Sequence, residues 1–590
     1  MSSLVIAQSK IAFDVSFTEP QAHYAEVEMN ISGLKAAHID LKMPVWTPGS
    51  YLIREFSKNV EGFKAFGSGG KELSFEKINK NTWRINTDNS GQVKVSYRVY
   101  SFEISVRTSF VDESHAFLSP AGTFMYPDGQ LNAASEVTIN PYKSWSKIST
   151  GLEKVSSKPN TFSAPDFDIL YDSPFEVGNQ DIFDFVAEGV QHEVAMYGGG
   201  NYDKEILKRD ISKIVTEQTR TFGVNPNKRY VFIVHNFNSG GGGIEHLNST
   251  VLGASRNSYN TEAGLLRFLG LVSHEYFHIW NVKRLRPIAL GPFDYNQENY
   301  TRNLWIAEGF TAYYQDIYTK RAGLQSPDRY LMNLATSISS VENQPGNRVE
   351  AVSDASFDAW IKQYRPNENS ANSTISYYSK GALIALIMDL ETIHSTQANA
   401  GLDEVMKAMY DEFYTKKGRG YTDAEFKTML EKISGKSFAD VYKDYVNGLK
   451  TIDYNKYLGY AGFTLTDDAD KGYDAYLGAV TALKDGKIIL TNVSRQSPAW
   501  NAGLNVNDEI LSIDGNRINN VSDPRLSEVE KFISGKKPGE KITISFNRDG
   551  LIRQTELTLV RNPNHRFRIG SLPNLTDSQI AVRKRWLKLN

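Results

Sequence analysis

Two histidines and a glutamate within residues 273–280 have the types and spacing of a metal site. His274 and His278 flank Glu275 in the order H-E-x-x-H. Because an α-helix has about 3.6 residues per turn, the two histidines fall on one face and both imidazoles can reach one ion. In this pattern the histidines bind zinc and the glutamate acts as general base. The alternative is a core helix that carries two histidines by chance.

The third metal ligand must be sought elsewhere in the chain. Cysteine is absent, which excludes disulfides, thiolate catalysis and Cys-ligated zinc, and leaves His, Asp and Glu as ligands. Catalytic zinc takes three protein ligands and keeps one open position for water. A single glutamate on a helix is ordinarily a solvated charge. Glu308 nevertheless becomes the candidate ligand, since it lies downstream of the zinc motif among the aromatic residues of W-I-A-E-G-F.

The elements around these residues can be read from their patterns. The apolar stretch 264–272 predicts a helix that ends in the zinc motif, and a second helical pattern at 304–314 carries Glu308. Upstream, residues 239–246 contain four consecutive glycines, which permit close approach of the backbone to a ligand, although a flexible loop explains them as well. The basic residues of 281–287 predict a solvated face.

Hydrophobic periodicity predicts several domains along the chain. Residues 11–167 show short alternating runs broken by turn residues, which predict an all-β domain. Within it, the aromatic, turn-rich segment 43–51 favours core and corner packing over a ligand site. A helix at 204–222 and a buried strand at 229–234 then indicate an α/β region. From about residue 304 to 449 the pattern is mainly helical, with a capping box at 422–425.

The C-terminal part resembles a PDZ domain. The resemblance rests on the runs 476–479, 488–493, 497–504 and 508–515, which occur in the order of that domain. Tyr476 and Ala479 depart from the usual G-L-G-F loop, so the loop does not define a peptide preference. A purely structural PDZ module is the alternative. A last helix begins with a capping box at 576–579.

The H-E-x-x-H motif with a downstream A-E-G-F glutamate resembles the gluzincin aminopeptidases. Residues 279–307 form a longer gap than in the aminopeptidase N relatives. With the G-G-G-I-E-H loop, the W-T-P-G-S-Y segment and the PDZ domain, nearly the whole chain is similar to the glycyl aminopeptidase family of PDZ-containing metallopeptidases. The resemblance implies a multidomain α+β fold with an N-terminal all-β domain (1–170), a thermolysin-like catalytic domain (171–320), an α-helical domain (321–455), a PDZ domain (459–562) and a C-terminal tail (563–590).

The same resemblance implies roles for further residues. Glu245, beside Gly242 and Gly243, matches the family glutamate that binds the free α-amine of the substrate; an ordinary loop carboxylate is the alternative. Tyr378 matches the Y-x-K-G tyrosine that stabilises the oxyanion. Its neighbour Tyr377 competes for that role, and core packing is the alternative for either.

The resemblance implies a zinc-dependent aminopeptidase that prefers N-terminal glycine or alanine. The alternatives are a zinc endopeptidase with PDZ-presented substrates and a non-catalytic PDZ adaptor. Expected partners are peptide substrates and a peptide or protein tail at the PDZ domain. With a net charge of -2, the chain lacks the excess of basic residues that is typical of nucleic-acid-binding proteins, so no nucleic-acid partner is expected. No apolar run approaches the roughly 20 residues of a membrane span, so no membrane partner is expected either. The N-terminus is not a complete signal peptide, so the chain is cytoplasmic as written or periplasmic if a signal was trimmed; the oligomeric state stays open.

Overall fold

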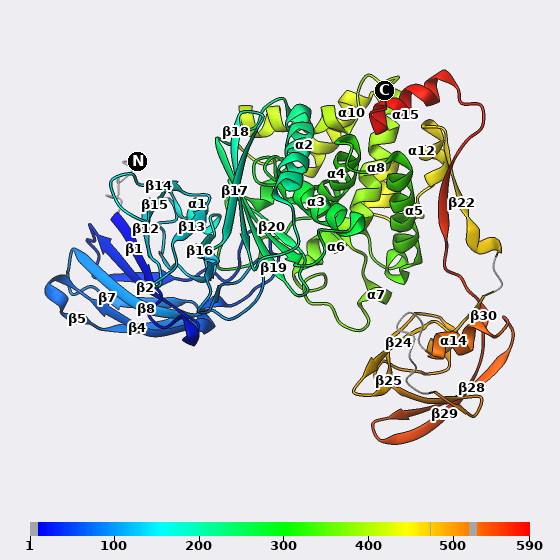
Figure 1. Ribbon diagram of the computed structural model, residues 1–590, viewed down its shortest axis with the longest axis horizontal. Coiled ribbons are helices and arrows are strands. Elements are labelled where there is room, and N and C mark those ends of the chain that lie inside the picture. The colour runs from blue at the N-terminus through cyan, green and yellow to red at the C-terminus, as the bar shows by residue number, and fades with distance from the viewer. Residues whose placement is uncertain (1–9, 472–473, 519–527, 590) are drawn as a thin grey trace. The chain divides into compact units, whose positions relative to one another are not determined.

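A computed structural model describes residues 10–471, 474–518 and 528–589 of the chain (Figure 1). The expected order of an N-terminal β domain, an α/β region, a helical region and a PDZ domain is confirmed. The chain divides into two compact units. The first contains Met1–Thr301, Tyr314–Gln325 and Asp403–Phe426, and the second contains Arg302–Tyr313, Ser326–Leu402 and Lys427–Asn590.

The N-terminal β domain is built on an eight-stranded sheet of order β14-β15-β12-β1-β2-β8-β4-β5, coloured blue to cyan in Figure 1. In β1 (Lys10–Ser16), β2 (Tyr24–Ser32) and β8 (Gln92–Tyr100), buried side chains alternate with more exposed ones, so each strand turns one face to the core. The other strands are β3 (His38–Lys42), β4 (Val60–Phe66), β5 (Glu72–Leu73), β6 (Phe75–Asn79), β7 (Thr82–Asn86), β9 (Phe110–Val111), β10 (Ala116–Leu118), β11 (Tyr126–Pro127), β12 (Ser135–Asn140), β13 (Lys147–Thr150), β14 (Glu153–Lys154), β15 (Thr161–Ala164) and β16 (Phe175–Gly178).

The aromatic segment 43–51 packs in the core, as predicted. Trp46 and Ser50 are fully buried, and Tyr51 is nearly so. The Trp46 indole N–H donates to the backbone carbonyl of Asp294 at 2.7 Å, which satisfies its one polar group. The segment therefore links the β domain to the polypeptide that follows the metal helix.

A five-stranded sheet of order β17-β18-β19-β21-β20 forms the α/β region. Its strands β18, β19 and β21 are parallel, and β20 is an antiparallel edge strand. The predicted helix at 204–222 is observed as α2, which begins after the cap residue Asp203. The elements are β17 (Asp181–Ala187), β18 (Val190–Tyr197), α2 (Lys204–Phe222), β19 (Arg229–Phe237), β20 (Gly243–Glu245), β21 (Ser249–Ser255) and α3 (Glu262–Phe277), with the short helix α1 (Phe167–Tyr171) before them.

The basic connection 281–287 is not the solvated face that its charges predict. Arg284 is buried and donates to the carbonyl of Ile279 at 2.9 Å and to the Asn227 side chain at 2.7 Å. Lys283 forms an ion pair with Asp172 at 2.7 Å, and its side chain is 6% exposed. The prediction was wrong because the partners of both cations lie far away in the sequence.

Helices dominate the chain after α3. Residues Trp305–Phe310 form a π-helical turn, η6, which continues into α4 (Thr311–Arg321). The capping box predicted at 422–425 is present, since the Thr422 N–H donates to Glu425 and the Glu425 N–H donates to Thr422. The other helices are α5 (Pro327–Asn343), α6 (Val352–Phe357), α7 (Ser370–Ser373), α8 (Tyr377–Ser395), α9 (Leu402–Met409), α10 (Asp423–Ser434), α11 (Ala439–Val441) and α12 (Tyr454–Tyr460).

The PDZ domain has a sheet of order β24-β25-β26-β28-β29. The predicted hairpin at 508–515 is confirmed: β26 pairs with β27 across Asp514 and Gly515, both with positive φ as a tight two-residue turn requires. The elements are β23 (Ala475–Tyr476), β24 (Ala479–Lys484), β25 (Lys487–Val493), α13 (Pro498–Asn501), β26 (Glu509–Ile513), β27 (Asn516–Arg517), α14 (Glu528–Ser534), β28 (Lys541–Arg548), β29 (Leu551–Thr558) and β30 (Val560–Arg561).

The polypeptide beyond the PDZ domain is ordered structure. Strand β31 (Phe567–Ser571) pairs with β22 (Phe463–Asp467), so the two ends of the PDZ segment lie together. Helix α15 (Asp577–Leu587) starts with the predicted capping box at Thr576. Trp586 is fully buried, and its N–H donates to the Tyr313 hydroxyl at 3.1 Å.

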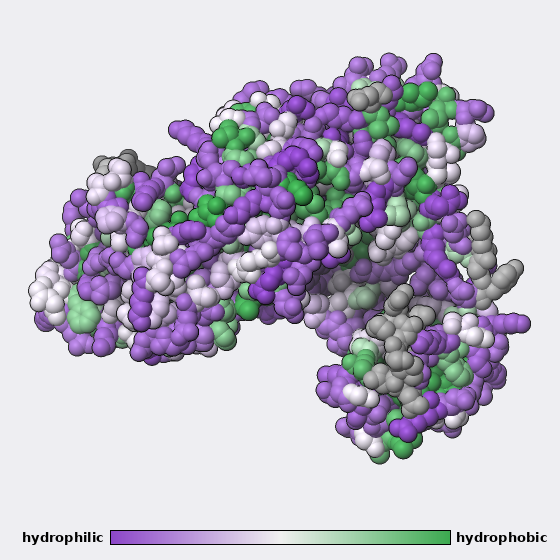
Figure 2. Space-filling model, viewed as in Figure 1, coloured by the Kyte–Doolittle hydropathy of each residue, from purple (hydrophilic) through white to green (hydrophobic). Residues whose placement is uncertain are grey.

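The surface gives no sign of a membrane-spanning helix. Among the described residues, none of the helices combines the length and apolarity needed to cross a bilayer. The face in Figure 2 is mainly hydrophilic, with hydrophobic side chains in small scattered groups. Such scattered groups are normal for a protein surface.

Two glycines allow η6 and α8 to approach at backbone distance. A Cβ on Gly309 would lie 2.6 Å from the Cα of Gly381, and a Cβ on Gly381 would lie 2.7 Å from the carbonyl oxygen of Trp305. Real Cβ atoms do not reach such distances, so only glycine fits at either position. Gly309 directly follows Glu308 in the sequence, and Gly381 lies three residues after Tyr378.

We expect Gly309→Ala to destabilise the protein by roughly 1–3 kcal/mol, because the added methyl group forces two backbones apart. Gly459→Ala is the matched control: it lies in helix α12 with no atom within 4 Å of the added Cβ. The control should be neutral or stabilising, since alanine is the better helix former. Urea unfolding followed by tryptophan fluorescence gives both midpoints, and equal midpoints for the two variants would contradict the close-packing argument.

Candidate active site

Helix α3 carries the H-E-x-x-H motif at its C-terminal end. Thr261 caps its start by accepting from the Gly264 N–H at 3.1 Å. His274 lies in the last turn and His278 is the C-cap residue, and their ring centroids are 4.8 Å apart. Both side chains are nearly buried, at 8% and 1% exposure. The predicted helix and the predicted proximity of the two imidazoles are therefore confirmed.

The hydrogen bonding of His278 selects its metal-binding nitrogen. Its Nδ1 lies 2.8 Å from the carbonyl oxygen of Asn281, which can only accept, so Nδ1 carries the proton. In the neutral ring Nε2 then holds the lone pair that a metal ion needs. A backbone carbonyl commonly orients metal-binding histidines in this way.

Edge strand β20 brings the glycine-rich loop against the general-base candidate. Gly243 is the first residue of β20, and a Cβ there would lie 2.3 Å from a carboxylate oxygen of Glu275. The Gly243 carbonyl accepts from Arg107 at 3.1 Å, which fixes the strand from the side of the β domain. The glycine at this position therefore provides the space that the Glu275 carboxylate occupies.

Glu245 ends β20 and points into the same region. One carboxylate oxygen each of Glu245 and Glu275 and one ring nitrogen of His278 lie within 4.8 Å of one another. Gly49 of the W-T-P-G-S-Y segment approaches so closely that its Cβ would lie 2.7 Å from a Glu245 oxygen. Glu245 is 4% exposed, and no described residue donates a hydrogen bond or forms an ion pair with its carboxylate. The segment 43–51 is thus both core and one wall of the site.

A buried ion-pair cluster holds the polypeptide next to Glu245. His246 Nδ1 lies 2.9 Å from Asp172, whose carboxylate also pairs with Lys283 and accepts from the Leu247 N–H at 2.8 Å. Burial acts to raise the pKa of Asp172, but the Lys283 ammonium and His246 outweigh it and hold that pKa below its usual value. Sequence reasoning missed this cluster, because nothing local to Asp172 marks it.

The second unit contains the other two predicted residues. Glu308 lies in the π-helical turn η6 and is 2% exposed. Tyr378 lies in the first turn of α8; burial and then the negative charge of Glu308 raise its pKa well above the ordinary value. Tyr377 is fully buried, whereas Tyr378 is only partly buried. Of the two tyrosines, Tyr378 is therefore the one with some surface exposed.

Comparison with known proteins gives three family matches along the chain. Residues 12–179 match the peptidase M61 N-terminal domain, residues 267–384 match the M61 glycyl aminopeptidase domain, and residues 475–559 match the PDZ domain. The second match includes the H-E-x-x-H motif, Glu308 and Tyr378.

Solved structures and curated proteins add further similarities. The crystal structure of an aminopeptidase N family protein from Idiomarina loihiensis is 30% identical, with a TM-score of 0.90 over 98% of this chain and 100% of that one. An M1 zinc metallopeptidase from Deinococcus radiodurans is 13% identical, with a TM-score of 0.48 over 76% and 96% of the two chains. The carboxy-terminal processing protease CtpB of Bacillus subtilis is 33% identical over 96 residues, which span 16% of this chain and 19% of CtpB.

We expect Gly243→Ala to reduce hydrolysis by about 10²-fold, because the methyl group must displace the Glu275 carboxylate by an ångström or so. Gly241→Ala in the same loop is the matched control, since no atom lies within 4 Å of its added Cβ. The measurement is kcat/KM on an aminoacyl amide for both variants. Similar losses in the two variants would contradict the assignment and point to general disturbance of the loop.

Proposed function

Because the chain belongs to the M61 glycyl aminopeptidase family, we propose that it is a zinc aminopeptidase that removes small N-terminal residues, glycine or alanine, from peptides. The single observation that carries the proposal is the buried pair of carboxylates, Glu245 and Glu275, beside His278. One of them can act on water, while the other can hold an amine. The preference for small residues follows from the family.

We assign the metal to His274, His278 and Glu308. All three side chains are buried, His274 and His278 in the first unit and Glu308 in the second. Two imidazoles and one carboxylate form the donor set of many catalytic zinc sites. The tautomer of His278, set by Asn281, supports the assignment.

The residues of this chain divide the chemistry of peptide hydrolysis among them. Zinc, when bound, polarises the scissile carbonyl and lowers the pKa of water. Glu275 takes the proton from the attacking water and returns it to the leaving amine. The Tyr378 hydroxyl donates to the oxyanion, and its raised pKa keeps it protonated for that purpose.

Glu245 selects substrates that have a free N-terminus. An ammonium group is the natural partner for a buried carboxylate that forms no ion pair with any residue the structure describes. Glycines 242 and 243 lie directly before Ile244 and Glu245, so this part of the loop presents backbone rather than side chains. An acetylated N-terminus has no charge to offer and leaves the Glu245 carboxylate unpaired.

We expect the enzyme to cleave glycyl and alanyl amides with free amines and to leave their N-acetylated forms intact. Glu245→Gln keeps the size of the side chain but removes its charge, so kcat/KM on free amines should fall by roughly two to three orders of magnitude. Zinc content, measured on the same samples, should stay unchanged.

Other outcomes support the alternatives. Equal cleavage of acetylated and free substrates would make the chain an endopeptidase, with the PDZ domain presenting protein tails to the site. No cleavage by the zinc-loaded wild type would favour the non-catalytic PDZ adaptor.

The two tyrosines at the start of α8 can be separated by matched substitutions. We expect Tyr378→Phe to lower kcat by about 10²–10³-fold with little change in KM, because the lost hydroxyl acts on the transition state. Tyr377→Phe should keep most of the activity. The reverse order of the two effects would transfer the oxyanion role to Tyr377.

A further inference from the structure

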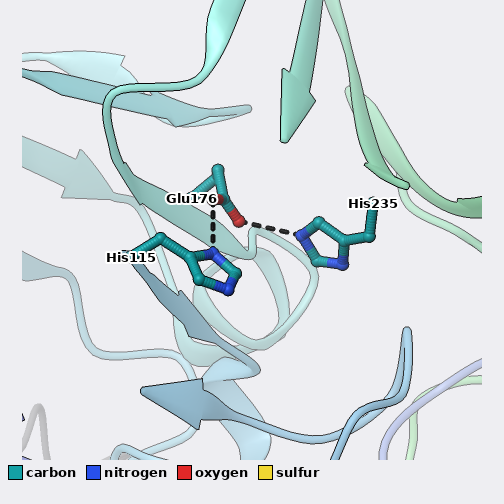
Figure 3. A group of neighbouring side chains, drawn as sticks. All are labelled: His115, Glu176 and His235. Atoms are coloured by element: carbon teal, nitrogen blue, oxygen red, sulfur yellow. Dashed lines mark hydrogen bonds and ion pairs between the residues drawn. The ribbon is translucent and has the colours of Figure 1, made fainter. Parts of the chain in front are cut away.

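A second cluster of histidine and glutamate side chains, none of them on α3, lies within the first unit (Figure 3). His115 Nδ1 is 2.8 Å from one carboxylate oxygen of Glu176, and His235 Nε2 is 2.8 Å from the other. Figure 3 shows both rings directed at the carboxylate. One potential metal-ligand atom from each of the three residues lies within 4.8 Å of the other two.

The cluster is sealed from solvent and held by regular structure. The side chains of His115, Glu176 and His235 are 1%, 0% and 3% exposed. Glu176 lies in β16 and His235 in β19, while His115 directly precedes β10. Side chains on strands are placed more rigidly than side chains on loops, as a preformed binding site requires.

Aromatic rings surround the cluster and orient its ligands. The ring of His115 stacks on Tyr197 with centroids 3.4 Å apart, and His235 meets the edge of Phe117 at 4.8 Å. His115 Nε2 is buried and has no hydrogen-bond partner among the described residues. Stacking, rather than a hydrogen bond to the second nitrogen, therefore fixes the His115 ring.

The charge of Glu176 has no permanently charged counterion among the described residues. Within the described residues its only ion-pair partners are His115 and His235. Neutral imidazoles leave one negative charge buried among aromatic rings, which is unfavourable unless a cation compensates it. Lysine or arginine fills that role elsewhere in the first unit but not here.

We propose that His115, Glu176 and His235 bind a divalent transition-metal ion, zinc in class, at a structural site separate from the one on α3. Two imidazoles and one carboxylate suit zinc, whereas calcium and magnesium prefer oxygen ligands throughout. A divalent ion also supplies the missing positive charge.

The geometry needs only a small adjustment to take the ion. Zinc bound at about 2.0–2.1 Å in tetrahedral coordination holds its ligand atoms roughly 3.3 Å apart. The nitrogen–oxygen distances of 2.8 Å must therefore open by about half an ångström.

The ion would be coordinated by residues of both the β domain and the α/β sheet and would thereby link the two. Strands β10 and β16 belong to one sheet, and β19 is the central strand of the next. Strand β19 pairs with β21, which in turn pairs with β20, the strand that carries Glu245. Loss of the ion should therefore lower stability first, with activity following only indirectly.

Metal content measured by plasma mass spectrometry on zinc-loaded, dialysed protein tests the proposal. We expect two equivalents in the wild type, one in His274→Ala/His278→Ala and one in Glu176→Gln. Glutamine keeps the size and both hydrogen-bonding positions of Glu176, so this variant should fold. Asp172→Asn, at a buried cluster that already has a lysine, is the matched control and should keep two equivalents.

Equal metal content in the wild type and Glu176→Gln, or no metal in His274→Ala/His278→Ala, would overturn the proposal and leave a metal-free cluster in which both imidazoles donate to Glu176. A second readout is thermal unfolding of His274→Ala/His278→Ala. A chelator should lower its Tm, and Glu176→Gln in the same background should abolish that shift. Because this background lacks the catalytic ligands, the result is independent of the proposed aminopeptidase activity.

Discussion

The second unit depends on a contact between two backbones at Gly309 and Gly381. A single methyl group at either position would collide with the facing helix, so the distance between η6 and α8 is set by the absence of side chains. The two glycines lower the intrinsic stability of their helices, because glycine costs up to about 1 kcal/mol relative to alanine in a helix. In return, Glu308 and Tyr378 are held at fixed separation on two rigid elements. The π-helical form of η6 belongs to the same compromise, because such turns occur mainly where function constrains a helix.

In the first unit, glycines likewise leave space at close contacts, here for carboxylate side chains rather than for a second backbone. Gly49 and Gly243 leave space where Glu245 and Glu275 would otherwise meet a Cβ. Two carboxylates within a few ångströms of each other repel when both are charged. Without a cation between or beside them the arrangement is unfavourable, and the rest of the fold must hold it in place. The buried aromatic segment around Trp46 and the Asp172 cluster are the parts that do so.

Local patterns were sufficient for much of the fold. The zinc helix, α2, the PDZ hairpin and two capping boxes each depend on residues close in sequence, and all were predicted. What failed or was missed depends on distant partners. Arg284 and Lys283 look solvated until Asn227 and Asp172 are known to lie beside them. The difference in burial between Tyr377 and Tyr378 has no local sequence signal, and neither does the cluster of His115, Glu176 and His235.

Three buried carboxylate sites in the first unit differ in how their charge is balanced, and the difference supports the role proposed for each one. Asp172 has Lys283 within 2.7 Å and needs nothing further, so its role is structural. Glu176 has two imidazoles but no lysine or arginine among the described residues, which suits a permanent metal ion. Glu245 has no such partner among them, which suits a cation that arrives and leaves, such as the ammonium of a peptide. A carboxylate buried without its own counterion is stabilised by a cation from outside the chain, and imidazoles beside it add ligands that a transition metal can use.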